Sequence, residues 1–245
     1  TSGEDGARSA VIPAREFSSA EGREEAFVGE SRLFKELAFL ADNQTKPVVY
    51  FTQGNGELSI AGEGDLPPER SAARFKAYLE KNYLDVRPLA LSLDKAELPA
   101  DADVVVGAGP RTPLPEAAAE ALRRYVTGPK KGKLVVLAGA VAGPDGRLLP
   151  TGLEGLLSDL NVRLGTQFVF SIPLPQMPIA PDSAVAVFSR SGLQNPILQA
   201  IIKVAPSLMF YNPRVVEPVR GGGNPAFQAT DLMLTDGLTW VDDRQ

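Results

Sequence analysis

The sequence predicts an α/β protein in which a largely parallel sheet is covered by helices on both faces, giving three layers. Two observations lead to this fold class. Short apolar runs rich in valine alternate with amphipathic segments of helical period as far as Leu160. The runs are apolar throughout, which is typical of parallel strands that are buried on both faces. The second half ends in short β segments, so we expect it to be more antiparallel.

Each expected element follows from a local pattern of residues. Helices are expected where apolar residues recur every three or four positions, and strands where β-branched and aromatic residues gather. Pro67 and Pro68 open one helix, as prolines do in a first turn, and Pro88 places its strand near a sheet edge. The expected helices span residues 30–42, 67–81, 115–126 and 196–204. The expected strands span residues 48–52, 86–91, 103–106, 134–137, 167–172, 185–188, 208–211, 215–219 and 232–234.

Two further local features complete the expected organisation. Thr151 and Glu154 have the spacing of a capping box at the start of another helix. Residues 1–26 are polar and rich in Gly, Ser and Glu, so we expect a flexible N-terminal arm with one edge strand near residues 10–13. Residues 27–245 are then expected to form a single α/β domain. The strand at residues 134–137 is expected to be buried.

Composition excludes several classes of function. The chain has 245 residues, 44% of them hydrophobic, and a net charge of −5 with both signs interspersed, so no basic face indicates nucleic acid. Cysteine and histidine are both absent, which excludes Ser-His-Asp triads, Cys-His pairs and zinc hydrolase centres within the chain. No apolar run reaches the roughly 20 residues that cross a bilayer. We therefore expect no catalytic residue and no direct insertion into a membrane, and a first residue other than Met suggests an excised piece of a longer protein.

The most informative segment is the run Val48–Phe51, which stops at a Gly-Asn-Gly turn ending in a carboxylate. Two glycines around an asparagine permit backbone angles that most residues avoid. In an α/β protein such a strand delivers its loop to the carboxyl edge of the sheet, where binding sites form. A second apolar strand ends in Gly-Ala-Gly and is expected at the same edge. The candidate binding residues are Gln53, Gly54, Asn55, Gly56, Glu57, Gly107 and Gly109.

Two interpretations of the Gly54–Glu57 turn stay open. In one, its backbone N–H groups bind a small anion or the end of a polymer, and Glu57 orients the ligand or accepts a proton. In the other, the turn is a tight connection that needs glycine at positive φ, and Glu57 caps the next segment. The second interpretation is favoured because Gly-rich turns are mostly structural.

Other motifs are weaker indications of a ligand. The loop at Gly107 lacks the third glycine of a dinucleotide fingerprint, because Thr112 stands there. The lysine-rich stretch 128–133 precedes a strand instead of opening a helix, so it is not a phosphate loop. Asp101 and Asp103 lack the further oxygen ligands that a hard cation needs. We expect neither a cofactor nor a metal.

A proline-rich loop spans residues 173–181 and keeps apolar side chains on an extended backbone. This combination suits a docking surface for another chain, and it equally suits a cover packed over the chain's own sheet edge. The residues expected at a partner surface are Leu174, Met177 and Ile179.

Several separated motifs together resemble one family, the auxiliary component of ABC-type transport systems, which includes the gliding-motility ABC-transporter auxiliary protein of bacteria. The order and spacing of the motifs carry the resemblance over roughly residues 26–241. Asn55 stands where this family often has His, and Lys131 stands where it usually has one of two paired glycines. The matching segments are Phe27–Glu30, Gln53–Glu57, Tyr83–Leu93, Leu98–Pro110, Lys131–Ala138, Gly152–Val162, Asn195–Ile201, Arg214–Val216 and Thr235–Trp240.

The resemblance implies a flavodoxin-like or class I glutamine-amidotransferase-like ectodomain on the periplasmic side of a bacterial membrane, excised from a membrane-anchored protein. It implies a non-catalytic binding or scaffolding function, with the membrane and ATPase subunits of an ABC transporter as partners and homo-oligomers as a further option. Two alternatives remain. One is a carboxylate-dependent hydrolase or transferase that uses Glu57 and a second carboxylate. The other is a degenerate amidotransferase-like module kept for oligomerisation.

Overall fold

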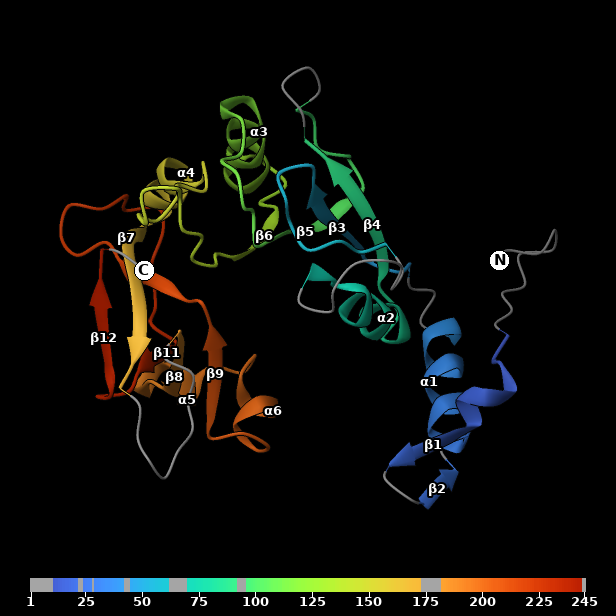
Figure 1. The fold of residues 1–245 in the computed structure, drawn as a ribbon. Coiled ribbons are helices and arrows are strands. Elements are labelled where there is room, and N and C mark those ends of the chain that lie inside the picture. Colours follow the sequence, from blue (N-terminus) through green and yellow to red (C-terminus); the bar gives the residue numbers. More distant parts are fainter. Residues whose placement is uncertain are drawn as a thin grey trace. The chain divides into compact units, whose positions relative to one another are not determined.

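The computed structural model describes residues 11–21, 24–27, 29–41, 45–61, 70–91, 96–172 and 182–243 (Figure 1). The contacts divide the chain into two compact units, residues 1–46 and residues 47–245. No helix of these described residues is long and apolar enough to cross a membrane. The proline-rich loop with Leu174, Met177 and Ile179 lies outside the described residues.

The first unit consists of a short 3-10 helix, a hairpin and one α-helix. The 3-10 helix η1 spans Ala14–Phe17, and strands β1 (Ser18–Glu21) and β2 (Glu24–Phe27) pair antiparallel. Helix α1 spans Gly29–Ala41. The edge strand expected near residues 10–13 is wrong, because residues 11–13 form no strand and the hairpin lies just beyond them. The boundary expected between residues 26 and 27 falls within β2.

The second unit contains the predicted parallel sheet. It consists of β3 (Val48–Gln53), β4 (Asp85–Ala90), β5 (Ala102–Ala108) and β6 (Lys133–Leu137) in the order β4-β3-β5-β6, and every neighbouring pair is parallel. The predicted α/β class with a parallel sheet is confirmed. Because the first strand lies inside the sheet, the strand order reverses between β3 and β5 (Figure 1). Ligands of open α/β sheets bind outside the carboxyl ends of the strands at such a point.

Helices cover both faces of this sheet, and alternating residues of β3 point to opposite sides. Val48 and Tyr50 pack with helices α3 (Glu116–Thr127) and α4 (Glu154–Asp159). Val49 and Phe51 belong to a second core cluster on the side of α2 (Ala73–Lys81). There the rings of Phe51 and Phe75 meet edge to face, with their centroids 5.9 Å apart. One side of α3 faces the core, and its buried residues are Ala118, Ala121, Leu122 and Tyr125.

The sequence predicted one of the two edge strands of this sheet and missed the other. Pro88 lies in β4, which is an edge strand as predicted, so its missing N–H removes no bond from the interior of the sheet. The prediction that residues 134–137 form a fully buried strand is wrong. β6 is the opposite edge strand, and Val135 and Leu137 are 44% and 47% exposed on one face. Leu134 and Val136 pack against the core on the other face.

The later part of the chain is antiparallel, as predicted. Strand β7 (Val162–Ser171) lies between β10 (Arg214–Pro218) and β12 (Thr239–Asp242). Strand β8 (Ser183–Phe188) lies between β9 (Ser207–Tyr211) and β11 (Met233–Thr235). β12 is an element that the sequence patterns did not predict.

Two helix predictions need correction. The single helix expected over residues 196–204 is replaced by α5 (Arg190–Gln194) and α6 (Gln199–Ile202). Asn195 between them is extended, as a residue before proline tends to be. The helix expected from Pro67 begins at Ala73, because Ser71 instead forms a parallel bridge with Ser59. Residues 62–69 lie outside the described residues.

Candidate functional site

The Gly54–Glu57 turn follows β3 and is a closed, internally bonded loop. Gly54 and Gly56 have φ of 115° and 76°, backbone angles that favour glycine. A Cβ added to Gly56 would lie only 3.0 Å from Cβ of Arg111, so the next loop lies close against the turn. The side-chain amide of Gln53 donates to the carbonyl oxygen of Leu58 at 3.0 Å and so spans the base of the turn.

Glu57 is bonded within its own turn. Its side chain is buried, at 6% exposure. One carboxylate oxygen accepts from the backbone N–H of Asn55 at 2.6 Å, and the other accepts from the side-chain amide of Asn55 at 3.4 Å. A carboxylate used in this way stabilises the turn, and it would have to give up these bonds to act as a base. This arrangement favours the interpretation of the turn as a tight connection.

The loop that carries Gly107 and Gly109 lies directly against the turn. The carbonyl oxygen of Asn55 accepts from the backbone N–H groups of Arg111 at 2.9 Å and Thr112 at 3.1 Å. The N–H of Leu58 donates to the carbonyl oxygen of Ala108 at 2.9 Å. The structure therefore brings all seven candidate residues to one edge of the sheet, beside the point where the strand order reverses.

This edge continues into the predicted capping box. Leu114 donates its N–H to the carbonyl oxygen of Thr151 at 2.8 Å. Glu154 accepts from the N–H groups of Thr151 at 2.7 Å and Gly152 at 2.9 Å, and the hydroxyl of Thr151 accepts from the N–H of Leu153 at 3.1 Å. One half of the expected exchange is thus present, from the N–H of Thr151 to Glu154, whereas the Thr151 hydroxyl accepts from Leu153 instead of Glu154, and the helix itself begins at Glu154.

A buried arginine ends this chain of contacts. Arg214 of β10 is 5% exposed and donates through Nε and Nη2 to the carbonyl oxygen of Gly165 in β7, at 3.3 and 2.8 Å. Its Nη2 lies 3.9 Å from Oε1 of Glu154. The motif comparison marked Arg214 without assigning it a role. The structure shows that it joins β7 and β10 to the start of α4.

The pKa values of this pair follow from burial and contact. Burial alone would raise the pKa of Glu154, but hydrogen bonds from Thr151 and Glu154 backbone groups and the charge of Arg214 outweigh it, so the pKa is lowered. Burial lowers the pKa of Arg214, and the nearby charge of Glu154 partly offsets this. The lowered pKa keeps the carboxylate of Glu154 charged at neutral pH.

The aspartates weighed as cation ligands are engaged with other groups at the amino end of the sheet. Asp101 accepts from the guanidinium of Arg87 at 2.7 Å and from the hydroxyl of Tyr50 at 3.1 Å. Asp103 accepts from the N–H of Val48 at 2.8 Å. Within the described residues, no group of three or more acidic side chains gathers as a metal site would require.

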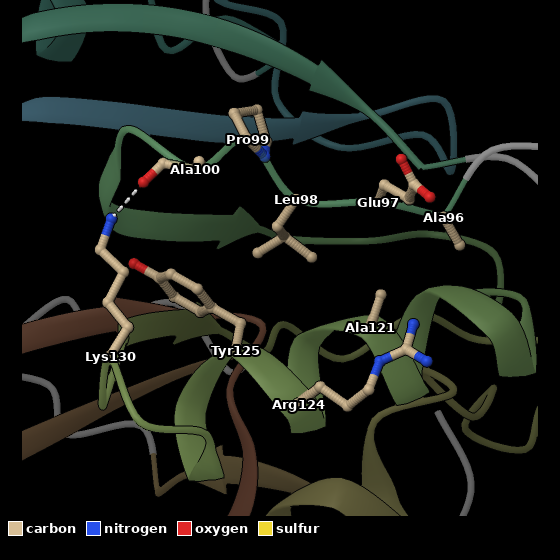
Figure 2. A pocket seen from close by; sticks show the side chains of 9 residues that line it. All are labelled: Ala96, Glu97, Leu98, Pro99, Ala100, Ala121, Arg124, Tyr125 and Lys130. Carbon is tan, nitrogen blue, oxygen red and sulfur yellow. Dashed lines mark hydrogen bonds between the residues drawn. The ribbon is translucent and has the colours of Figure 1, made fainter.

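Two cavities occur away from the candidate turn, and none of the seven candidate residues lines either of them. The first has a volume of about 340 Å³ and lies between α3 and the segment that precedes β5 (Figure 2). Lys130 donates to the carbonyl oxygen of Ala100 at 2.7 Å at one end, as Figure 2 shows. Burial raises the pKa of Tyr125, which lies beside Lys130. The first cavity is lined by Ala96, Glu97, Leu98, Pro99, Ala100, Ala121, Arg124, Tyr125 and Lys130.

The second cavity lies on the α3 and α4 side of β6 and has a volume of about 270 Å³. Its lining comes from the parallel sheet, from both helices, and from strands β7 and β10. The sequence patterns indicated neither cavity, because each is formed by segments far apart in the chain.

No protein-family model matches the chain, and no curated protein is significantly similar to it. The resemblance to ABC-transporter auxiliary components therefore stays a prediction from the order of the motifs.

Proposed function

We propose that the chain is a non-catalytic binding or scaffolding domain of an ABC-type auxiliary subunit, positioned on the extracytoplasmic side of the membrane. The observation that carries the proposal is the hydrogen bonding of Glu57. The carboxylate that was the best candidate for chemistry accepts from Asn55 in its own turn. Since the chain has no histidine or cysteine to act beside it, a contact surface is a better use of this edge than catalysis.

The strand order supports the fold that this family implies. With β3 as the first strand, the order β4-β3-β5-β6 corresponds to the 2-1-3-4 arrangement at the start of a flavodoxin-like sheet. We infer a flavodoxin-like core to which the antiparallel sheets are added. A partner would then contact the loops at the carboxyl edge of the parallel sheet. Two arginines, Arg70 and Arg111, lie there against the Gly54–Glu57 turn.

The test is co-purification with an ABC transporter. The chain is co-expressed with the membrane and ATPase subunits of an ABC transporter from the same organism, and the complex is isolated through a tag on the membrane subunit. We expect retention of the wild-type chain and at least tenfold weaker retention of Arg111→Glu. Arg220→Glu, an exposed charge reversal in the loop after β10, is the matched control and should be retained like wild type. Absence of retention of the wild-type chain would contradict the proposal.

The catalytic alternative is tested separately. The purified chain is assayed against a panel of chromogenic esters, phosphoesters and glycosides, and we expect no turnover above background. Turnover that Glu57→Gln abolishes, while circular dichroism shows the variant to be folded, would replace the binding function by a carboxylate-dependent enzyme.

A specific observation favours oligomerisation as a second candidate function. β9 is an edge strand without charged residues, and its consecutive residues Met209, Phe210 and Tyr211 are 45%, 45% and 69% exposed. An uncharged edge strand with exposed apolar side chains is suited to pairing with another strand. A second copy would satisfy this edge through an antiparallel pairing of two β9 strands.

A further inference from the structure

The side chains that line the second cavity are aliphatic, and backbone atoms supply the polar part of its surface. Each of its nine lining side chains is Val, Leu or Ala, and together they extend over five secondary-structure elements. Val126 comes from α3, Val136 from β6, Leu157 from α4, Leu164 from β7 and Val216 from β10. We call this space the aliphatic cavity.

The chemistry of the lining selects the class of ligand. The side chains offer no hydrogen-bond donor or acceptor, so a polar group placed among them would lose its bonds to water without replacement. A hydrocarbon needs no hydrogen-bond partner among these side chains and gains dispersion contacts with them. The side chains therefore favour an aliphatic part of a ligand.

The volume limits the size of that part. The aliphatic cavity holds about 270 Å³. An engineered apolar cavity of about 150 Å³ accommodates benzene, which has six carbon atoms. Scaled by volume, the aliphatic cavity has room for at most about eleven carbon atoms, and because it opens to solvent we expect it to cover roughly eight to ten.

The exposure of the lining residues shows where the cavity opens. Leu157 and Leu164 are both 8% exposed, whereas Val216 of β10 is 55% exposed. The opening therefore lies beside Val216. The charged neighbours in the same two strands, Arg163 and Glu217, form an ion pair with each other on the opposite face. A polar end group that leaves the cavity here therefore meets solvent, so it adds little selectivity.

We propose that the aliphatic cavity binds a single alkyl chain of eight to ten carbon atoms, with the polar end of the ligand outside at Val216. This site is separate from the candidate turn and does not depend on the proposed function. A chain of this length is found in medium-length fatty acids and other single-chain amphiphiles.

The test is a titration with sodium carboxylates of six to sixteen carbons, each kept below its critical micelle concentration. Isothermal titration calorimetry measures the affinity, and NMR contacts between ¹³C-labelled decanoate and valine methyl groups locate the chain. We expect one saturable site whose affinity rises about fourfold for each added methylene up to ten carbons and then levels off. Decanoate and uncharged decyl maltoside should bind within about threefold of each other, since no charged side chain selects the head.

A matched pair of variants on β6 tests the location. Val136 faces the aliphatic cavity, whereas its neighbour Val135 is 44% exposed on the opposite face. Val136→Phe fills the cavity and should abolish decanoate binding, while Val135→Phe adds the same ring outside and should bind like wild type. If Val136→Phe does not fold, Leu160→Phe in the same lining serves as the second filling variant and should also abolish binding.

Three outcomes would overturn the proposal. The first is no saturable binding by wild type up to millimolar decanoate. The second is equal weakening by Val135→Phe and Val136→Phe, which would assign binding to the general surface. The third is adsorption to phosphatidylcholine vesicles without saturable binding of decanoate, which would assign the apolar contact to a membrane surface.

Discussion

At the scale of single residues, Glu57 and Glu154 have the same physical task at the carboxyl edge of the sheet. Each carboxylate accepts hydrogen bonds from backbone N–H groups two or three positions earlier in the chain. Loops that lie against a sheet edge carry N–H groups that no strand or helix satisfies, and an unpaired buried N–H is costly. The two glutamates supply acceptors for these groups and so fix the loops that they follow.

Removing the side chain of Glu57 should therefore destabilise the protein. Glu57→Ala leaves the N–H of Asn55 buried without its acceptor, and we expect a loss of about 1–3 kcal/mol in the free energy of unfolding. Glu57→Gln keeps one acceptor oxygen and should lose less. Urea denaturation followed by circular dichroism measures both. Equal stability of Glu57→Ala and wild type would show that the turn is held by other contacts.

Glu154 should make the stability depend on pH. Its pKa in the folded protein lies below the usual value of about 4.3, so the unfolded chain binds more protons in the interval between the two pKa values. The contribution of Glu154 is complete above the unfolded pKa and is lost as the pH falls through the folded pKa. Urea titrations from pH 3 to 7 should show a smaller acid-induced loss for Glu154→Gln than for wild type. Identical pH profiles would contradict this.

Two glycines at the same edge allow a matched comparison. Gly54 and Gly152 both have positive φ, of 115° and 80°. A Cβ on Gly54 meets nothing within 4 Å, whereas one on Gly152 would lie 2.5 Å from the carbonyl oxygen of Leu114. Gly54→Ala should cost roughly 1 kcal/mol of strain, and Gly152→Ala should cost clearly more because backbone must also move. Thermal and urea unfolding measure the loss of stability of both variants. Equal losses would show that the loop at Gly152 can move away from Leu114 at no cost in free energy.

At the scale of elements, the local sequence predicted whether most segments are helices or strands. The spacing of apolar residues and the choice of residue types carry this information. Strands β3 and β5 and helix α3 correspond closely to the predicted ranges. The errors lie at edges and ends. Val135 and Leu137 look like buried strand residues, and only the position of β6 at the end of the sheet leaves them exposed. Pro88 was the one local signal of an edge, since proline lacks the N–H that an interior strand uses.

The uncharged edge strand β9 should control self-association. Met209→Lys places a charge on a strand edge that is otherwise apolar, a device by which natural proteins block edge pairing. Val135→Lys is the control. Val135 is 44% exposed and Met209 is 45% exposed, but Val135 lies in the parallel sheet and not in the sheet that contains β9. Sedimentation velocity over a hundredfold range of concentration should show self-association of wild type and Val135→Lys, and a monomeric Met209→Lys. Self-association of all three proteins would exclude β9 as the interface.

At the scale of the whole molecule, the candidate site was predictable in part. The glycines and Glu57 mark the carboxyl edge from sequence alone, because turns at positive φ have a strong local signature. The hydrogen bonds from Asn55 to Glu57 and the role of Arg214 were not predictable. Arg214 contacts Gly165 and Glu154, which lie far from it in sequence. No repeating pattern in the local sequence distinguishes a buried arginine from an exposed one. The aliphatic cavity was hidden for the same reason.

The order in which the antiparallel strands occur along the chain has a consequence for folding. One sheet takes β7, β10 and β12, and the other takes β8, β9 and β11, so their strands are interleaved in sequence. A nascent chain that ends at Pro218 still lacks one outer strand of each sheet. Neither antiparallel sheet has all of its strands before Thr235, and one lacks its last strand until Asp242, whereas the parallel sheet has all of its strands by Leu137. We therefore expect the parallel sheet to form first during synthesis and the interleaved antiparallel strands to fold together in a later, slower step.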